Sequence, residues 1–272
     1  MPKTLLNGSL AALLILVACQ KTEGQPSVFG GEGAKVADEK PLPEGAGKPE
    51  ALGPCGKPGP VSDAALIDDF EDGNDRIFKA FERDGFWFSA SDKTEGSTIT
   101  PLAPFAAELL PAAEASKENR YAAHLTAAGE KNWGVVWGAA LQWTREGIKC
   151  PLNVSAFAGV RFRAKGPGTI RVSMAVPEVT PKEGGGTCAD RCYDAHGKVF
   201  LLSSAWDTYE MRWEKMQQGG WGTEARFTPE RVVNLAVNVD VKSLPADLWL
   251  DDVELIPKTA PAQAAAPAAA AP

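Results

Sequence analysis

Apolar and polar side chains alternate with a period of two along much of this chain. The alternation is regular over residues 160–165, 170–176 and 234–240, where apolar residues are separated by polar or small ones. A strand with one buried and one solvated face produces this pattern, whereas an amphipathic helix repeats every 3.6 residues. These three segments are therefore predicted to be strands.

Seven further segments have the composition of strands, and Gly, Pro, Asn and Asp separate many of them. They are 64–70, 86–89, 121–126, 133–143, 199–203, 209–213 and 248–256. Only 105–110 and 229–232 are helix-like, and both are short. About ten strands without intervening helices predict an all-β fold, an antiparallel β-sandwich of the jelly-roll kind.

The first eighteen residues have the pattern of a secretory signal peptide, with Lys3 followed by an apolar stretch and small residues before Cys19. This ending resembles a bacterial lipobox, in which Cys19 is lipidated and becomes the mature N-terminus. The unbroken apolar part, 10–17, is shorter than the roughly 20 residues that cross a bilayer, which argues against an uncleaved anchor. Gln20 is typical of lipoproteins sorted to the outer membrane, so we expect an exported protein held at the cell envelope by its lipid alone.

The composition predicts four parts. Residues 1–18 are the signal peptide, and 19–62 hold the lipidated cysteine and a linker rich in Gly, Pro, Glu and Lys, which we expect to be disordered. Residues 63–257 have the length of one domain. Residues 258–272 are an Ala/Pro tail of low complexity, which we also expect to be unstructured.

Four cysteines remain after Cys19, and an even number in an oxidising compartment favours two disulfides. We favour Cys188 with Cys192, which share one loop, and Cys55 with Cys150, which would join the start of the domain to its middle. The alternative is a metal site, since Cys188, Cys192 and His196 are spaced four residues apart with aspartates between them.

The net charge of −7 argues against a nucleic-acid partner, which requires a basic surface. The two histidines lie in no nucleophile or metalloenzyme motif. Nothing in the sequence requires a catalytic residue, although paired carboxylates of a glycoside hydrolase remain open as an alternative.

Three local motifs go beyond a generic β protein: Ile-Asp-Asp-Phe-Glu-Asp-Gly at 67–73, Trp-Asp-Thr-Tyr-Glu at 206–210, and Leu-Trp-Leu-Asp-Asp-Val-Glu-Leu at 248–255. Together they resemble the galactose-binding-domain-like jelly rolls, in particular the family-11 carbohydrate-binding modules, over residues 63–257. The resemblance implies a non-catalytic domain that binds a polysaccharide.

The resemblance also implies a structural calcium ion shared by the first and last strands. The ligands would be Glu71 and one of Asp251 or Asp252, with help from the stretch that contains Asp69. Calcium prefers six to eight hard oxygen ligands, which a carboxylate-rich edge can supply. The alternative is a solvated acidic turn without a metal.

Sugars are held by aromatic faces and by fixed polar side chains. In 133–143 the tryptophans alternate with Val and Leu, which favours a core row in which Trp143 is the best candidate for exposure. Trp206 and Trp221 are candidates in loops or at strand edges. We expect the polar positions of the alternating strands to form one solvated face if the strands are neighbours; the candidates there are Arg161, Arg163, Arg171, Ser173, Glu210, Arg212, Asn234, Asn238 and Asp240.

The leading hypothesis is therefore a surface lipoprotein that binds a polysaccharide or a cell-envelope glycan without acting on it. The second is a structural lipoprotein that docks a protein partner with the same sandwich. The third is a small glycan-active hydrolase with two facing carboxylates.

Overall fold

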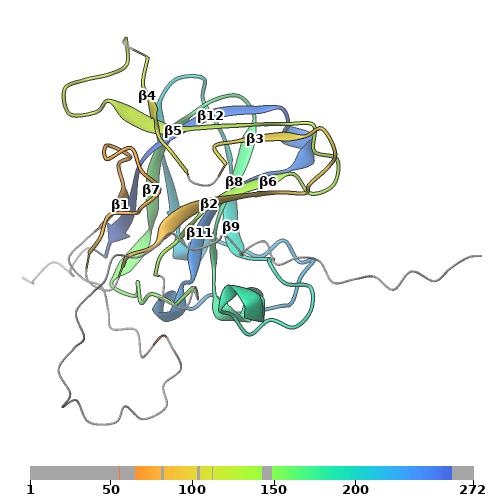
Figure 1. The fold of residues 1–272 in the computed structure, drawn as a ribbon. Helices are drawn as coiled ribbons and strands as arrows, with labels where there is room; N and C mark the ends of the chain where they lie inside the picture. Colours follow the sequence, from red (N-terminus) through yellow and green to blue (C-terminus); the bar gives the residue numbers. More distant parts are fainter. Residues whose placement is uncertain are drawn as a thin grey trace, which may run out of the picture. The chain divides into compact units, whose positions relative to one another are not determined.

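The computed structural model describes Cys55 and residues 65–80, 83–102, 105–111, 113–142 and 149–258. Within these residues twelve strands form two antiparallel sheets, and the connections contain five short 3-10 helices and no α-helix (Figure 1). The two sheets pack against each other as a β-sandwich, which confirms the predicted fold class.

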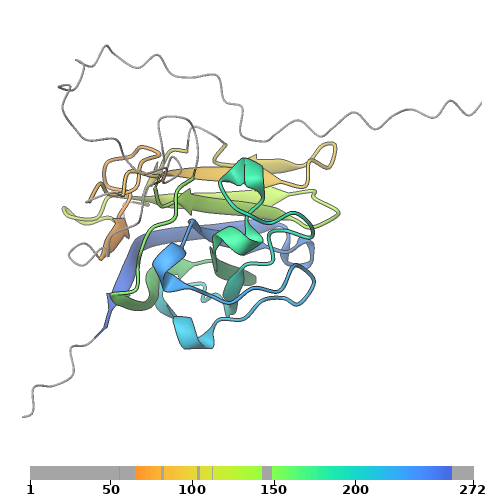
Figure 2. The ribbon, with the colours of Figure 1, turned by 90° about the horizontal axis from the view of Figure 1, so that it is seen from below.

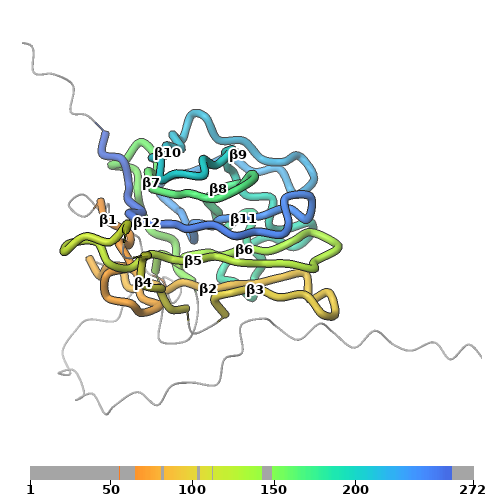
Figure 3. Tube along the Cα trace, turned by 90° about the horizontal axis from the view of Figure 1, so that it is seen from above, coloured from red at the N-terminus to blue at the C-terminus, as the bar shows by residue number. Residues whose placement is uncertain are grey.

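The first sheet contains the strands β1 (Leu66–Asp68), β3 (Thr98–Thr100), β4 (Glu108–Leu109), β5 (Tyr121–Ala128), β7 (Phe157–Lys165), β10 (Asp207–Arg212) and β12 (Ala246–Pro257). The second contains β2 (Phe86–Ser91), β6 (Val135–Ala140), β8 (Thr169–Ala175), β9 (His196–Leu201) and β11 (Asn234–Val239). Figure 3 shows that the two sheets run in matching order, β10-β7-β12-β5-β3 beside β9-β8-β11-β6-β2. Because the chain crosses repeatedly between sheets, the connectivity is that of a jelly roll.

Residues from the inner faces of both sheets form one core. Trp87 and Trp137 are its largest side chains, and both are almost fully buried. Trp137, Ala139 and Leu141 lie in this core, so the predicted core row of 133–143 is confirmed there. Trp133, at the start of the row, is exposed. Trp137, with the small residues beside it on β6, helps to fill the space between two sheets about 10 Å apart.

All ten predicted strands are present, with ends that differ by a few residues. The helix-like interpretation of 105–110 is wrong, because β4 lies there and pairs with β5 through Glu108 and Leu109. The segment 229–232 contains a 3-10 helix, Pro229–Arg231. The pattern also missed β3, since three residues are too few to show a period of two.

Both predicted disulfides are present. Cys55 is bonded to Cys150, 95 residues later, and Cys188 to Cys192 within one loop. The sulfurs of Cys188 and Cys192 are therefore not available as thiolate ligands, and the alternative metal site with His196 is wrong. His196 instead contacts the ring of Phe227.

No helix in the described part of the chain is long and apolar enough to cross a membrane. The predicted parts 1–18 and 258–272, the linker and Cys19 lie outside the described residues, apart from Cys55 in the linker and Lys258 at the start of the tail.

Candidate ligand-binding face

The predicted polar face is divided between the two sheets, so that prediction is corrected. Arg161, Arg163, Glu210 and Arg212 lie on β7 and β10 of the first sheet. The other predicted residues on strands are on the second sheet: Arg171 and Ser173 on β8, and Asn234 and Asn238 on β11. The polar side of an alternating strand points away from the core, so the two groups face opposite directions.

Small residues form a row across the outer side of the second sheet. The strand register aligns Gly138 of β6 with Ala236 of β11, then with Ser173 of β8 and Gly197 of β9. Phe88 of β2 ends the row. The four small residues of this small-residue row are buried, because larger side chains cover them: the ring of Phe88 lies over Gly138, and Asn238 contacts Ser173.

Arg171 is fixed beside this row. Its Nη2 donates to the carbonyl oxygens of Ala195, at 2.9 Å, and Gln217, at 2.6 Å. Both Nη2 hydrogens are therefore used, whereas Nε and Nη1 have no hydrogen-bond partner among the described residues. Burial lowers the pKa of Arg171 from its ordinary value, and nearby Asp194 opposes this change.

Two asparagines flank the row on β11. Asn238 lies directly opposite Arg171, and its Nδ2 donates to the backbone carbonyl of Arg171 and to the hydroxyl of Ser173, both at 3.0 Å. The side-chain orientation of Asn238 is thereby fixed, and its Oδ1 accepts no hydrogen bond from a described residue. Asn234 lies four residues away on the same face, about 13 Å along the strand.

A lysine covers the other end of the row. The Nζ of Lys149 lies 3.8 Å from the centre of the Phe88 ring, a cation–π contact. Lys149 is almost fully buried, and this desolvation lowers its pKa to about 8. Sequence analysis missed Lys149 because it lies outside any alternating segment.

Trp221 belongs to a loop held tightly by Asp194. The buried Asp194 carboxylate accepts hydrogen bonds from four consecutive backbone N–H groups, those of residues 219–222, at 2.7 to 3.1 Å. Gln217, at the start of this loop, exchanges backbone hydrogen bonds with Gly197 at the edge of β9. The loop therefore continues the second sheet beyond β9 and carries Trp221, which is 58% exposed.

The connection between β8 and β9 contains the 3-10 helices Pro177–Val179 and Lys182–Gly184. Figure 2, seen from below, shows this connection in front of the strands, on the side of the second sheet. The second disulfide and Asp194 belong to the same connection. It thus shapes one end of the outer face.

Aromatic and cationic side chains form a different arrangement on the first sheet. The rings of His124 and Trp249 are stacked 4.2 Å apart and are nearly parallel. Lys165 Nζ lies 5.6 Å from the ring centre of Trp249 and 5.3 Å from that of Trp206. Lys165 also forms an ion pair with Glu114, which accepts a hydrogen bond from Trp206 Nε1 at 2.8 Å. Trp249 thus contacts both His124 and Lys165, which leaves it poorly placed as a stacking platform.

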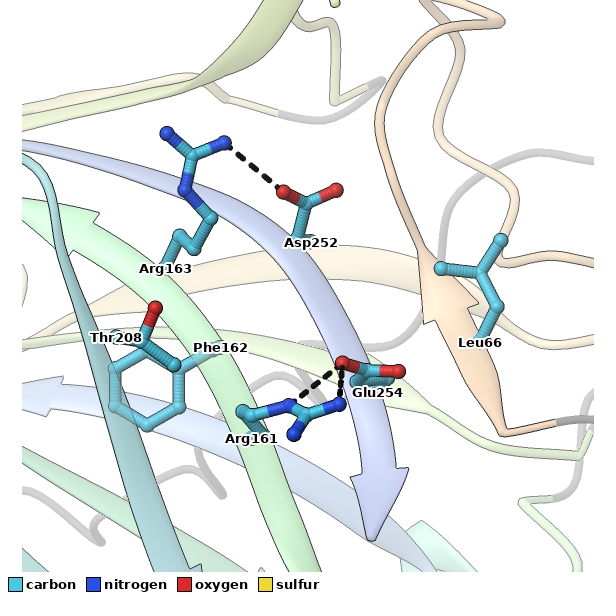
Figure 4. A pocket seen from close by; sticks show the side chains of 7 residues that line it. All are labelled: Leu66, Arg161, Phe162, Arg163, Thr208, Asp252 and Glu254. Carbon is cyan, nitrogen blue, oxygen red and sulfur yellow. Dashed lines mark hydrogen bonds and ion pairs between the residues drawn. The ribbon is translucent and has the colours of Figure 1, made fainter.

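A small pocket of about 180 Å³ also opens on the first sheet (Figure 4). Arg161 pairs with Glu254 at 2.6 Å and Arg163 with Asp252 at 3.0 Å. The remaining lining residues are Leu66, Phe162 and Thr208. Glu210 accepts hydrogen bonds from Arg212, so these charges are already paired with one another.

The first and last strands meet where the calcium ion was predicted. Asp251 is fully buried, which raises its pKa to about 6, and its Oδ2 accepts a hydrogen bond from Asn119 Nδ2 at 2.8 Å. The Oδ1 of Asn119 is buried without a partner among the described residues. Glu71 accepts hydrogen bonds from the backbone N–H groups of Arg120 and Tyr121, the two residues that follow Asn119.

Two other predicted calcium ligands have different contacts. Asp69 accepts a hydrogen bond from the backbone N–H of Glu71, and Asp252 pairs with Arg163. In the described residues no cluster of three or more His, Cys, Asp or Glu is arranged to hold a metal ion. Asn119 was not among the predicted residues, because the prediction was based on carboxylates and an amide side chain far along the chain gives no such signal.

No family model matches this chain, and no curated protein does. Among solved structures it is similar to the family 11 carbohydrate-binding module of the cellulosomal cellulase Lic26A-Cel5E of Clostridium thermocellum, with 14% identity, 73% of this chain and 96% of that chain covered, and a TM-score of 0.45. It is also similar to a family 30 carbohydrate-binding module (14% identity, 68% and 99% covered, TM-score 0.40). A third is the CBM22-1 xylan-binding domain from Paenibacillus barcinonensis Xyn10C (11% identity, 74% and 99% covered, TM-score 0.37).

All three TM-scores are below 0.5, so the assignment of function rests on the side chains of this chain. Trp143, the remaining predicted aromatic, lies outside the described residues and stays a prediction.

Proposed function

We propose that this chain is a lipid-anchored protein of the bacterial cell envelope that binds a polysaccharide or an envelope glycan without acting on it. The ligand lies on the outer side of the second sheet. The observation that carries the proposal is the pair Arg171 and Asn238, which are fixed by the protein and still have unused hydrogen-bonding groups.

Fixed donors and acceptors of this kind suit the hydroxyl groups of a sugar, because no side-chain ordering is needed when the sugar binds. Arg171 and Asn238 are both partly exposed, so a sugar can reach their unused groups. Trp221 adds an exposed aromatic face at the β9 edge, and aromatic faces pack against the apolar side of sugar rings.

The composition of the same face supports the proposal of a binding role without catalysis. Glycoside hydrolysis uses two carboxyl groups roughly 5 to 9 Å apart. None of the strands β2, β6, β8, β9 and β11 contains Asp or Glu. Asp194, at the rim, is buried and engaged by four N–H groups.

A second candidate function is docking of a protein partner. The observation that favours it is the exposure of Val199 (58%) and Leu201 (74%) on the outer side of β9. Exposed apolar side chains in a row on an outer strand are typical of interaction sites.

A glycan array with the full chain, followed by calorimetry on the hits, tests these alternatives. We expect a hit whose affinity falls at least fivefold in Asn238→Ala and Trp221→Ala, because each removes one direct contact. Lys117→Met, in the exposed loop between β4 and β5, is the control and should bind normally. Silence on plant, microbial and peptidoglycan-type sugars would favour the protein-docking alternative.

We also propose a structural calcium ion between the first and last strands. The residues present fit such an ion: Asp251 is a buried carboxylate, and Asn119 has a buried oxygen without a donor. Glu71 is held next to Asn119, because it accepts hydrogen bonds from the backbone N–H groups of Arg120 and Tyr121. These three side chains would hold the ion, which would neutralise the buried charge and join the strands without taking part in chemistry.

A further inference from the structure

Charge is distributed unevenly between the two sheets. The chain contains 35 acidic residues, and β1, β4, β10 and β12 of the first sheet all carry them. The five strands of the second sheet carry none, although they contain Arg171 and Lys198. In a protein with a net charge of −7, these strands therefore contribute cations and no carboxylates, and Asp194 is the acidic group that acts on Arg171.

The cations on the outer side of this sheet lie at both ends of the small-residue row. Arg171 extends toward Ala195 and Gln217 at the β9 end, and Lys149 covers Phe88 at the β2 end. Four strand spacings, or about 19 Å, separate these edges. Both cations are partly or largely shielded from water, so their field over the row is screened less than that of exposed charges.

We propose that the ligand of this face is an acidic glycan, a polysaccharide that carries carboxylate or sulfate groups, and that Arg171 pairs with one of these groups. This inference rests on the function proposed above and adds the chemical class of the ligand. The guanidinium is held by two carbonyl oxygens through Nη2 and donates to the anion through Nη1 or Nε. Asn238, directly opposite, binds a neighbouring hydroxyl through its Oδ1.

Electrostatics explains why an acidic chain would select this face. The arginines of the first sheet are already paired with carboxylates, whereas Arg171 has unused donors on strands without carboxylates, so an acidic ligand is repelled less there. A charge-assisted hydrogen bond to a partly buried arginine is worth more than a neutral one, because the local dielectric is low.

The test compares matched pairs of polysaccharides with the full chain by calorimetry: polygalacturonate and alginate with their methyl esters, and dextran sulfate with dextran. We expect at least one charged member to bind tenfold or more tightly than its neutral partner, with an affinity that falls as salt is raised. A preference for polygalacturonate or alginate over its methyl ester would identify carboxylate as the recognised group. A preference for dextran sulfate over dextran would identify sulfate.

Variants locate the contact. Arg171→Met should weaken binding of the charged member about tenfold and reduce the difference in affinity between the charged and neutral members, whereas Arg171→Lys should keep part of that difference. Lys117→Met removes a charge elsewhere and should bind normally. Because the comparison of charged and neutral polysaccharides uses the unaltered protein, it decides the question even if a variant does not fold.

The outcomes distinguish this inference from the proposed function. Equal binding of charged and neutral members overturns the acidic-ligand inference and leaves a glycan-binding protein. Binding of double-stranded DNA as tight as that of the charged polysaccharides also overturns it, since any polyanion would then suffice. No binding of any polysaccharide overturns the proposed function itself.

Discussion

Lys149 shows how burial changes the behaviour of a single residue. It is 4% exposed, and the loss of hydration disfavours the charged ammonium and lowers its pKa to about 8. In the unfolded chain the same group has a pKa near 10.4. The charged form of Lys149 therefore lowers the free energy of unfolding, and this cost disappears when the lysine is deprotonated.

We expect the wild-type protein to gain up to about 3 kcal/mol from Lys149 as the pH rises from 8 to 10. In that window the unfolded chain binds more protons at this site than the folded protein does, so the free energy of unfolding increases with pH. Urea denaturation at several pH values would measure the slope. Lys149→Met should flatten it, and an equal slope in both proteins would contradict the explanation.

Asp194 is the second residue whose environment decides its role. We expect Asp194→Ala to cost about 3 kcal/mol of stability, because four backbone N–H groups lose their acceptor. Thermal and urea denaturation would measure the loss. Asp190→Asn is the matched control, since that side chain is 86% exposed, and a similar cost in both variants would mean that the four hydrogen bonds contribute little.

At the scale of elements, the sandwich is closed where β12 pairs with β1, β5 and β7. Asp251 and Glu254 flank an irregularity in the β12–β7 pairing, and Asp252 between them has a positive φ of 46°. Across this bulge the core positions of β12 change from Leu250 to Val253 and Leu255, while Asp251 is buried beside Asn119 and Asp252 reaches Arg163.

The calcium proposal predicts a stability effect at this edge. Adding a chelator to the purified protein should lower the melting temperature by several degrees, and excess calcium should restore it. Asn119→Ala and Glu71→Gln should each reduce the calcium-dependent increase, whereas Asp252→Asn should retain it. An unchanged melting curve, with no metal in elemental analysis, would remove Glu71, Asn119 and Asp251 as ligands.

At the scale of the whole molecule, the two disulfides constrain loops of very different size. Cys55–Cys150 closes 95 residues of chain and Cys188–Cys192 closes four. By the chain-entropy relation, the first should stabilise the fold by about 5 kcal/mol and the second by about 2 kcal/mol. Replacing each pair with serines and measuring urea denaturation tests this ratio. Equal losses would show that the short disulfide acts mainly on the native loop.

Much of the fold could be read from the pattern of the strands. Alternation over 160–165 and 234–240 predicts which side chains point inward, because successive residues of a strand face opposite sides whatever its neighbours are. The favoured pairing of the four cysteines is also the one observed: Cys188 and Cys192 share one loop, and Cys55 and Cys150 join the start of the domain to its middle. The lipidated Cys19 and the flanking segments remain predictions from composition.

The sequence alone determined that this protein is an all-β sandwich, since the period of two is a local property of each strand, and its cysteines favoured two disulfides over a metal site. Only the tertiary structure decided that Arg171 and Asn238 share one face while Glu210 and Arg212 lie on the other. It also brought Asn119 to Asp251 and Lys149 to Phe88. The reason is that alternation distinguishes inside from outside for each strand separately, whereas membership of a sheet depends on pairing between residues far apart in the chain.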